Sequence, residues 1–167
     1  MSNIVPQSLS RLEIEKLIPH KGKMLLVTRV KNHNSREHTI STEFDVTQDC
    51  IFYSEKISGI PSWSVFEIMA QGISVLASIE RIESNNPEPP KPGVLLSVAN
   101  YKASVPSFKI NTTFSMNIKE ECRVDAVSRY NCSLYMAQEN QKEKECLVSA
   151  TISVMEMNDM KSFFNQN

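Results

Sequence analysis

Clustered positive charge is missing from this chain of 167 residues. Its 18 Lys and Arg are scattered and are balanced by 19 Asp and Glu, which gives a formal net charge of −1. Proteins that follow a nucleic-acid backbone neutralise its phosphates with a basic patch. We therefore expect no nucleic-acid partner.

The first residues also lack the pattern that is typical of an export signal. The first residues, Met1 to Gln7, contain no basic region followed by an apolar run. The longest apolar stretch is interrupted by Pro61, Glu67 and Gln71, which makes it a poor membrane span. We expect a cytoplasmic protein that does not insert into membranes and that forms one domain over residues 1–167.

Cysteine pairs of the metal-binding or redox type are missing as well. The four cysteines form no C-x-x-C motif and have no histidine nearby in sequence to complete a zinc site: Cys50, Cys122, Cys132 and Cys146. Without an export signal we expect reduced, mainly structural thiols. We expect no metal centre and no cofactor.

Charge is almost absent between Ile57 and Ile79, where Glu67 carries the single ionisable side chain. Apolar residues recur there every three or four positions, which is helical spacing: Trp63, Phe66, Met69, Ala70, Ile73, Leu76 and Ala77. A narrow polar stripe has the same spacing: Ser64, Glu67, Gln71, Ser74 and Ser78. The pattern predicts a buried helix that begins at Pro61, with its two aromatic residues in the core or in the wall of a substrate tunnel.

The position of Glu67 has two interpretations. Burying an ionised carboxylate without a partner costs several kcal/mol. Such a group is either satisfied by neighbours such as Ser64 or Gln71, or kept for chemistry. We favour chemistry, and Glu67 is the first candidate catalytic residue.

The rest of the chain reads mainly as strands. Ser10 to Glu13 fits a capping box and predicts a short helix that stops at Pro19. The strand-like segments are 24–31, 39–46, 93–103, 111–119, 123–136 and 145–157. Residues 84–93, rich in proline, predict a loop, and residues 138–144 predict a polar connection. The tail from Asn158 has too little pattern to interpret.

One long uncharged helix among about six strands predicts an α+β fold. A curved antiparallel sheet wrapped around the helix, the hot-dog fold, would hide its whole circumference. A flat sheet with the helix on one face, as in cystatin-like or ferredoxin-like folds, would leave more of the helix exposed. The absence of charge from Ile57 to Ile79 favours wrapping.

Two segments resemble a known family. Leu17 to Val30, which opens Leu-Ile-Pro-His, and Pro61 to Gly72, which contains Pro-Ser-Trp and Glu-Ile-Met-Ala-Gln, are similar to segments of hot-dog 3-hydroxyacyl-[acyl-carrier-protein] dehydratases. The greater likeness is to the branch associated with aryl polyene biosynthesis. Within this resemblance, Glu67 matches the carboxylate of the central helix and Gln71 the polar residue one turn later.

The resemblance fails at one position. Fatty-acid dehydratases carry a catalytic histidine in a loop before the central helix, whereas Ile51 to Gly59 contains none. In the aryl polyene branch the Pro-His segment is kept, so the resemblance implies that His20 replaces the missing base. The alternative for His20 is a helix cap or a backbone contact. We expect His33 and His38, which lie beside an expected hairpin turn, to be solvated.

The resemblance implies dehydration of a 3-hydroxyacyl thioester, with His20 as base and Glu67 as acid. Backbone N–H groups at the start of the helix would receive the thioester oxygen. The expected substrate-binding residues are Ser62, Trp63, Ser64 and Gln71.

The thioester would be carried by an acyl carrier protein or by coenzyme A, and the resemblance implies a homodimer. Four basic residues near His20 have two interpretations, either a contact surface for an acidic carrier protein or ordinary solvated surface: Lys21, Lys23, Arg29 and Lys31. Two other functions remain open. In an acyl thioesterase, Glu67 would activate water or attack the thioester. A non-catalytic hot-dog subunit would bind acyl chains or support a partner.

Overall fold

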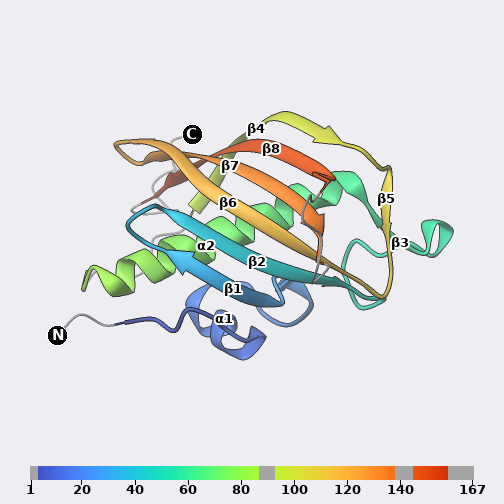
Figure 1. Cartoon of the computed structure of the whole chain (residues 1–167), viewed down its shortest axis with the longest axis horizontal. Helices are drawn as coiled ribbons and strands as arrows, with labels where there is room; N and C mark the ends of the chain where they lie inside the picture. Colours follow the sequence, from blue (N-terminus) through green and yellow to red (C-terminus); the bar gives the residue numbers. More distant parts are fainter. Residues whose placement is uncertain (1–3, 87–92, 138–144, 158–167) are drawn as a thin grey trace, which may run out of the picture.

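A six-stranded antiparallel sheet curves around a 19-residue helix in the computed structural model (Figure 1), which describes residues 4–86, 93–137 and 145–157. The helices are α1 (Arg11–Leu17) and α2 (Val65–Glu83), with short 3-10 turns η1 (Gly22–Met24), η2 (Glu55–Ile57) and η3 (Ser62–Ser64). The main strands are β1 (Arg29–Asn34), β2 (Thr39–Val46), β4 (Gly93–Ala103), β6 (Thr112–Val124), β7 (Val127–Met136) and β8 (Val148–Glu156). Two short strands, β3 (Gly59–Pro61) and β5 (Ser107–Lys109), pair with each other.

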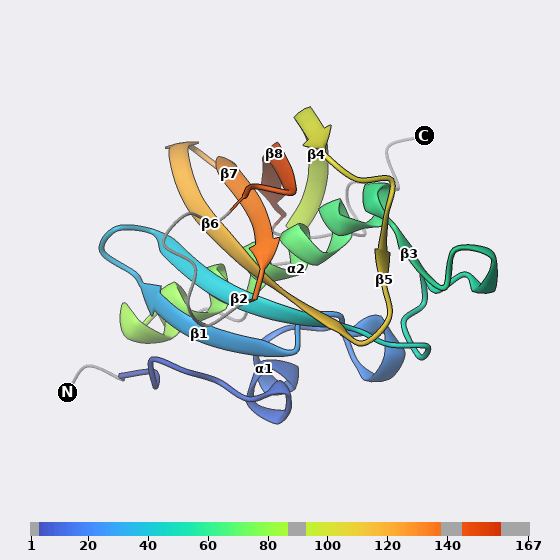
Figure 2. The ribbon, with the colours of Figure 1, turned by 45° about the vertical axis from the view of Figure 1, so that its right-hand side comes forward.

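The strand order of the main sheet is β1-β2-β6-β7-β8-β4, so β1 and β4 are its edges. Figure 2 shows α2 in the hollow of the curved sheet, with β1 and β4 on either side of it. This arrangement confirms the predicted α+β hot-dog fold. It also explains why α2 carries so little charge, because the sheet covers most of its circumference.

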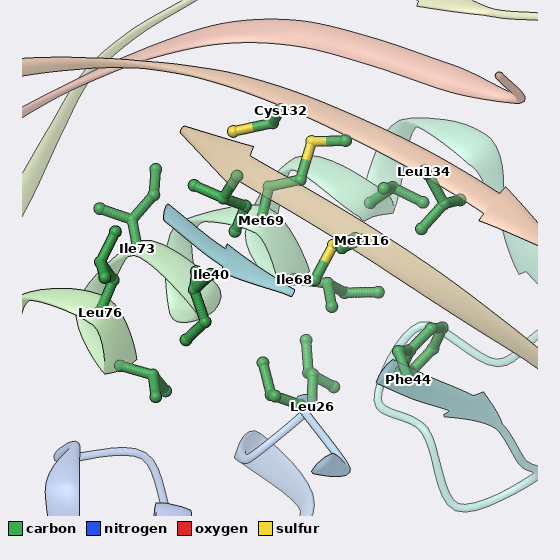
Figure 3. Close-up of a cluster of buried hydrophobic side chains, with 14 of the residues drawn as sticks. Leu26, Ile40, Phe44, Ile68, Met69, Ile73, Leu76, Met116, Cys132 and Leu134 are labelled. Carbon is green, nitrogen blue, oxygen red and sulfur yellow. The ribbon is translucent and has the colours of Figure 1, made fainter. Parts of the chain in front are cut away.

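The core forms where α2 faces the sheet. Figure 3 shows Ile68, Met69, Ile73 and Leu76 of α2 packed among side chains of β2, β6 and β7. The members of this cluster are almost completely buried, and each large apolar side chain contributes about 1.5–3 kcal/mol. Gly72 permits the close approach, because a Cβ there would lie 2.5 Å from Cδ1 of Ile118 on β6.

The start of α2 differs from the prediction. Pro61 pairs with Ser107 as the last residue of β3, and the α-helix begins only at Val65, after η3. The helix ends at Glu83, where the predicted loop begins, and the carboxylate of Glu83 accepts the Val5 N–H (3.4 Å) and the Ser35 hydroxyl (2.5 Å). The capping box of Ser10 and Glu13 is confirmed.

Other local predictions need correction. The first strand begins at Arg29 rather than Met24, because Met24 to Leu26 are tied to α2 instead of to a neighbouring strand. His33 is buried, and its Nε2 lies 3.0 Å from the carbonyl of Pro6, so it is not solvated. The short β3–β5 pair was not predicted. The connection at 138–144, the loop at 87–92 and the tail from Asn158 lie outside the described residues.

The segment Ser62–Glu83 is long and apolar enough to cross a membrane by length and composition. However, 61% of its most apolar window is buried by the protein itself. Its apolar character is therefore that of a core helix.

Candidate active site

His20 and Glu67 meet at the surface of α2. Nε2 of His20 lies 3.8 Å from Oε1 of Glu67, and each side chain is 28% exposed. His20 comes from the loop after α1, and Glu67 from the first turn of α2. The structure thus brings together the two residues that the sequence proposed as catalytic. It also corrects one expectation, since Glu67 is only partly buried because a groove opens on this side of the helix.

Gln71 binds the C-terminal part of the loop that carries His20. The side-chain oxygen of Gln71 accepts the N–H of Leu26 (2.8 Å), and its amide nitrogen donates to the carbonyl of Met24 (2.9 Å) and to Oε1 of Glu67 (3.1 Å). Gln71 is fully buried, and these bonds use both of its amide hydrogens. The residue that the sequence suggested for substrate binding therefore fixes the loop and the carboxylate.

Ser78 holds the same loop from its N-terminal side. Its hydroxyl donates to the carbonyl of Leu17 at 2.9 Å, two turns along α2 from Gln71. Arg11 and Lys21 add further bonds within the loop, to the carbonyls of Gly22 and Ile18. Two residues of the polar stripe, Gln71 and Ser78, therefore anchor the segment from Leu17 to Leu26. His20 lies within this anchored segment, and its buried Nδ1 has no hydrogen-bond partner among the described residues.

The residues at the start of α2 are arranged differently from the prediction. The N–H of Ser62 already donates to the carbonyl of Pro106 (2.9 Å), and the hydroxyl of Ser64 donates to that of Pro61 (2.7 Å). The carbonyl of Ser62 accepts the hydroxyl of Tyr101, which comes from β4. Unlike Glu67 and Gln71, Ser62 and Ser64 do not line the groove beside His20.

Trp63 is 56% exposed rather than part of the core. Its ring packs edge-to-face against Phe52 with a centroid distance of 5.7 Å. The side chain points outward because the turn η3 precedes the part of α2 that the sheet encloses. Trp63 does not line the groove either.

The groove beside the pair has a volume of about 1180 Å³. It starts at His20 and Glu67 and follows α2 past three small side chains, Ala70, Ser74 and Ala77. Leu95 of β4 and Val154 of β8 form part of its other wall. A long, partly apolar groove that begins at a base and an acid suits a substrate with an extended apolar chain.

Charged residues line the far part of the groove. Nδ1 of His38 lies 2.8 Å from Oε1 of Glu80, and a guanidinium nitrogen of Arg123 lies 3.3 Å from Oε2. Arg123 also pairs with Glu120 at 2.6 Å. Burial has the largest effect on the pKa of Glu120 and raises it, but the hydrogen bonds and charge of Arg123, with smaller effects of Tyr130 and His38, together outweigh it, so this pKa lies below its usual value. No local pattern in the sequence predicts this cluster, because its members come from separate elements.

The basic group near His20 is largely occupied. Lys23 pairs with Asp49 (3.2 Å), and Lys31 pairs with Glu43 (3.5 Å). Arg29 bonds to the carboxylates of Glu43 and Asp45. Lys21 is bound to carbonyl groups at the end of α1. These contacts reduce the charge available to an acidic carrier and favour the interpretation of ordinary surface.

Comparisons with solved structures support the fold. A chain of the dehydratase heterocomplex ApeI:P from Xenorhabdus doucetiae aligns with a TM-score of 0.77 and 18% identity, covering 92% of this chain and 97% of that one. A sigma28-regulated virulence protein from Campylobacter jejuni aligns with a TM-score of 0.62 and 10% identity, covering 90% and 94%. A hypothetical thioesterase with coenzyme A from Streptococcus pneumoniae TIGR4 aligns with a TM-score of 0.54 and 8% identity, covering 77% of this chain and 84% of that one.

Similarity at these identities establishes the fold alone, since hot-dog proteins carry several activities. No curated protein matches the chain. The family assignment comes from a family model described as ApeP dehydratase, which matches residues 12–165. This match confirms the resemblance drawn from the two sequence segments. The chain therefore belongs to the ApeP-like family of dehydratases.

Proposed function

We propose that this protein removes water from a 3-hydroxyacyl thioester to form a 2-enoyl thioester, with His20 and Glu67 as its catalytic residues. The observation that carries the proposal is the separation of 3.8 Å between the imidazole and the carboxyl at the head of a long groove. Two proton-transferring groups so close together can act on adjacent carbons of one chain.

The proposed reaction moves two protons. Neutral Nε2 of His20 takes the proton from C2, and protonated Glu67 gives its proton to the hydroxyl on C3. The C–O bond breaks, water leaves, and the electrons of the C2–H bond form the double bond. His20 is then protonated and Glu67 ionised. Transfer of one proton from the imidazolium to the carboxylate restores the starting pair.

The carrier of the substrate is a further part of the proposal. We expect an acyl carrier protein or coenzyme A, because a thioester acidifies the C2 hydrogens that His20 must remove. The protein would act in the cytoplasm as a single hot-dog unit of residues 1–167, and as a homodimer. The edge strand β4 supports the homodimer, because Leu95 and Leu96 on it are 38% and 47% exposed and an open edge favours strand pairing.

An acyl thioesterase is the second candidate. The partial exposure of Glu67 favours it, because a carboxylate open to the groove could activate water or attack the thioester. In that reaction the thiol would leave, and loss of His20 would matter less.

The experiment that separates the two offers the protein 3-hydroxyacyl and saturated acyl thioesters. Wild type is compared with His20→Ala and Glu67→Gln, and both enoyl product and free thiol are measured. Enoyl product that disappears in both variants supports dehydration. Thiol release from the saturated substrate supports the thioesterase, and no turnover of either overturns both.

A further inference from the structure

The groove changes its chemistry along its length. Beside the catalytic pair it is bordered by small or apolar side chains: Ala70, Ile73, Ser74, Ala77, Leu95 and Val154. Farther along α2 it is bordered by Glu80, Arg123 and His38. The first part can cover a hydrocarbon chain, whereas the second is lined by ions.

The length of the apolar part follows from helix geometry. Glu67 and Ala77 are ten residues apart on α2, which corresponds to roughly 15 Å at 1.5 Å per residue. Three bonds of an extended chain cover roughly 3.5 Å, so about twelve carbons span that distance. A chain that starts at the catalytic pair thus reaches the charged part after about twelve carbons.

The charged part is unfavourable for a longer hydrocarbon. Glu80 has only 14% of its side chain exposed, and its two carboxylate oxygens are shared between His38 and Arg123. Glu120 is less exposed still, at 8%, and is held by Arg123. A methyl end placed against these groups would remove water from them without offering a hydrogen bond in return.

We propose that the acyl chain lies along α2 in this groove and that Glu80, with its partners His38 and Arg123, sets its maximum length, so that straight acyl groups of about twelve carbons or fewer are preferred. The proposal rests on the proposed function, since it takes the catalytic pair as the place where the thioester end lies. Glu80 is in this account a specificity-determining residue that contacts the far end of the substrate.

The first experiment measures kcat/KM for 3-hydroxyacyl thioesters from four to eighteen carbons. Each buried methylene raises kcat/KM roughly fourfold, so the values should climb with length and then stop rising near twelve carbons. Ala77→Phe fills the groove and should lower the maximum length, with a loss of kcat/KM that is smallest for four-carbon substrates and grows with chain length. Ser74→Phe, which lies nearer to Glu67, should lower it further. Equal loss at every length in both variants would overturn the proposal.

The second experiment moves the limit outward. Glu80→Met replaces the carboxylate with an apolar side chain, while Arg123 keeps Glu120 as a partner. We expect kcat/KM for a sixteen-carbon substrate to rise roughly fourfold or more relative to a ten-carbon one. The matched control is Glu121→Met, which removes the same charge at an exposed position outside the groove lining. An equal change in both variants would overturn the proposal.

A binding measurement separates this inference from the catalytic one. Saturated acyl-pantetheine amides cannot be dehydrated, and calorimetry reports their affinity for the wild type and for Ala77→Phe and Glu80→Met. If no 3-hydroxyacyl thioester is dehydrated but affinity still stops rising near twelve carbons, the length limit stands and the dehydratase proposal fails. If dehydration occurs but neither kcat/KM nor affinity stops rising near twelve carbons, the proposed length limit is wrong and the dehydratase proposal stands.

Discussion

The amide oxygen of Gln71 accepts the backbone N–H of Leu26 at 2.8 Å, across 45 positions of sequence. The same side chain donates to Met24 and to Glu67, so one residue fixes both the loop of His20 and the carboxylate that faces it. Ser78 completes the attachment through Leu17. The geometry of the catalytic pair therefore depends on groups of α2 that need not touch a substrate.

Gln71→Leu should disturb both folding and catalysis. The change leaves the buried N–H of Leu26 and the partly buried carbonyl of Met24 without their partner, so we expect a loss of about 2–4 kcal/mol in the free energy of unfolding. Urea denaturation measures this loss. Because His20 and Glu67 lose their common support, kcat should fall more than KM changes.

A matched control for stability is Ser74→Ala on the same face of α2. The hydroxyl of Ser74 donates to the carbonyl of Ala70 within its own helix, so its loss should cost less than about 1 kcal/mol. If Gln71→Leu is no more destabilising than this control, the two hydrogen bonds of Gln71 to Met24 and Leu26 do not hold the loop.

Gly72→Ala tests how closely α2 approaches the sheet. The added Cβ would lie 2.5 Å from Cδ1 of Ile118, so we expect a cost of about 1–3 kcal/mol despite the better helix propensity of alanine. Ile118→Val removes that atom. Gly72→Ala should therefore be less costly in the Ile118→Val background, by about 1 kcal/mol in a double-mutant cycle. Additive costs would mean that the two residues are not in contact.

Tyr101 should make the protein less stable in alkaline solution. Burial raises the pKa of Tyr101 to about 12 from its ordinary value of 10.0. Above pH 10 the unfolded chain loses this proton while the folded protein keeps it, so ionisation favours unfolding. The stability that Tyr101 contributes is present below pH 10 and is lost as the pH rises toward 12.

The measurement is urea denaturation of wild type and Tyr101→Phe at several pH values. Near pH 8 the variant should be less stable, because it lacks the hydrogen bond to the carbonyl of Ser62. Above pH 10 the difference should shrink, since the variant has no hydroxyl to ionise at this position. A constant difference across the range would show that Tyr101 titrates alike in both states.

The sequence predicted the central part of this fold because the pattern was strong there. The missing charge from Ile57 to Ile79 identified the core helix, and alternation identified five of the six main strands near their observed positions. The first strand begins later than predicted because Leu25 and Leu26 are buried within a loop whose backbone bonds to Gln71, rather than within a strand. Local sequence cannot distinguish these two kinds of burial.

The site was only partly predictable. Glu67 could be identified from its isolation in the helix, but His20 required the family resemblance, since one histidine after a short helix has no distinctive pattern. Of the two interpretations of Trp63, the one that placed it in the core was wrong, because helical spacing does not reveal that η3 precedes the enclosed part of α2. The cluster of Glu80, Arg123 and His38 forms only when three distant segments fold together.

The most direct test of the account measures kcat/KM for dehydration of one 3-hydroxyacyl thioester by wild type, His20→Ala, Glu67→Gln and the double variant. If the two residues act as one proton-transferring unit, each single variant should lose about 10²–10⁴-fold, and the double variant should be no worse than the poorer single one. Full activity in either single variant, or losses that multiply in the double variant, would contradict the shared role of His20 and Glu67.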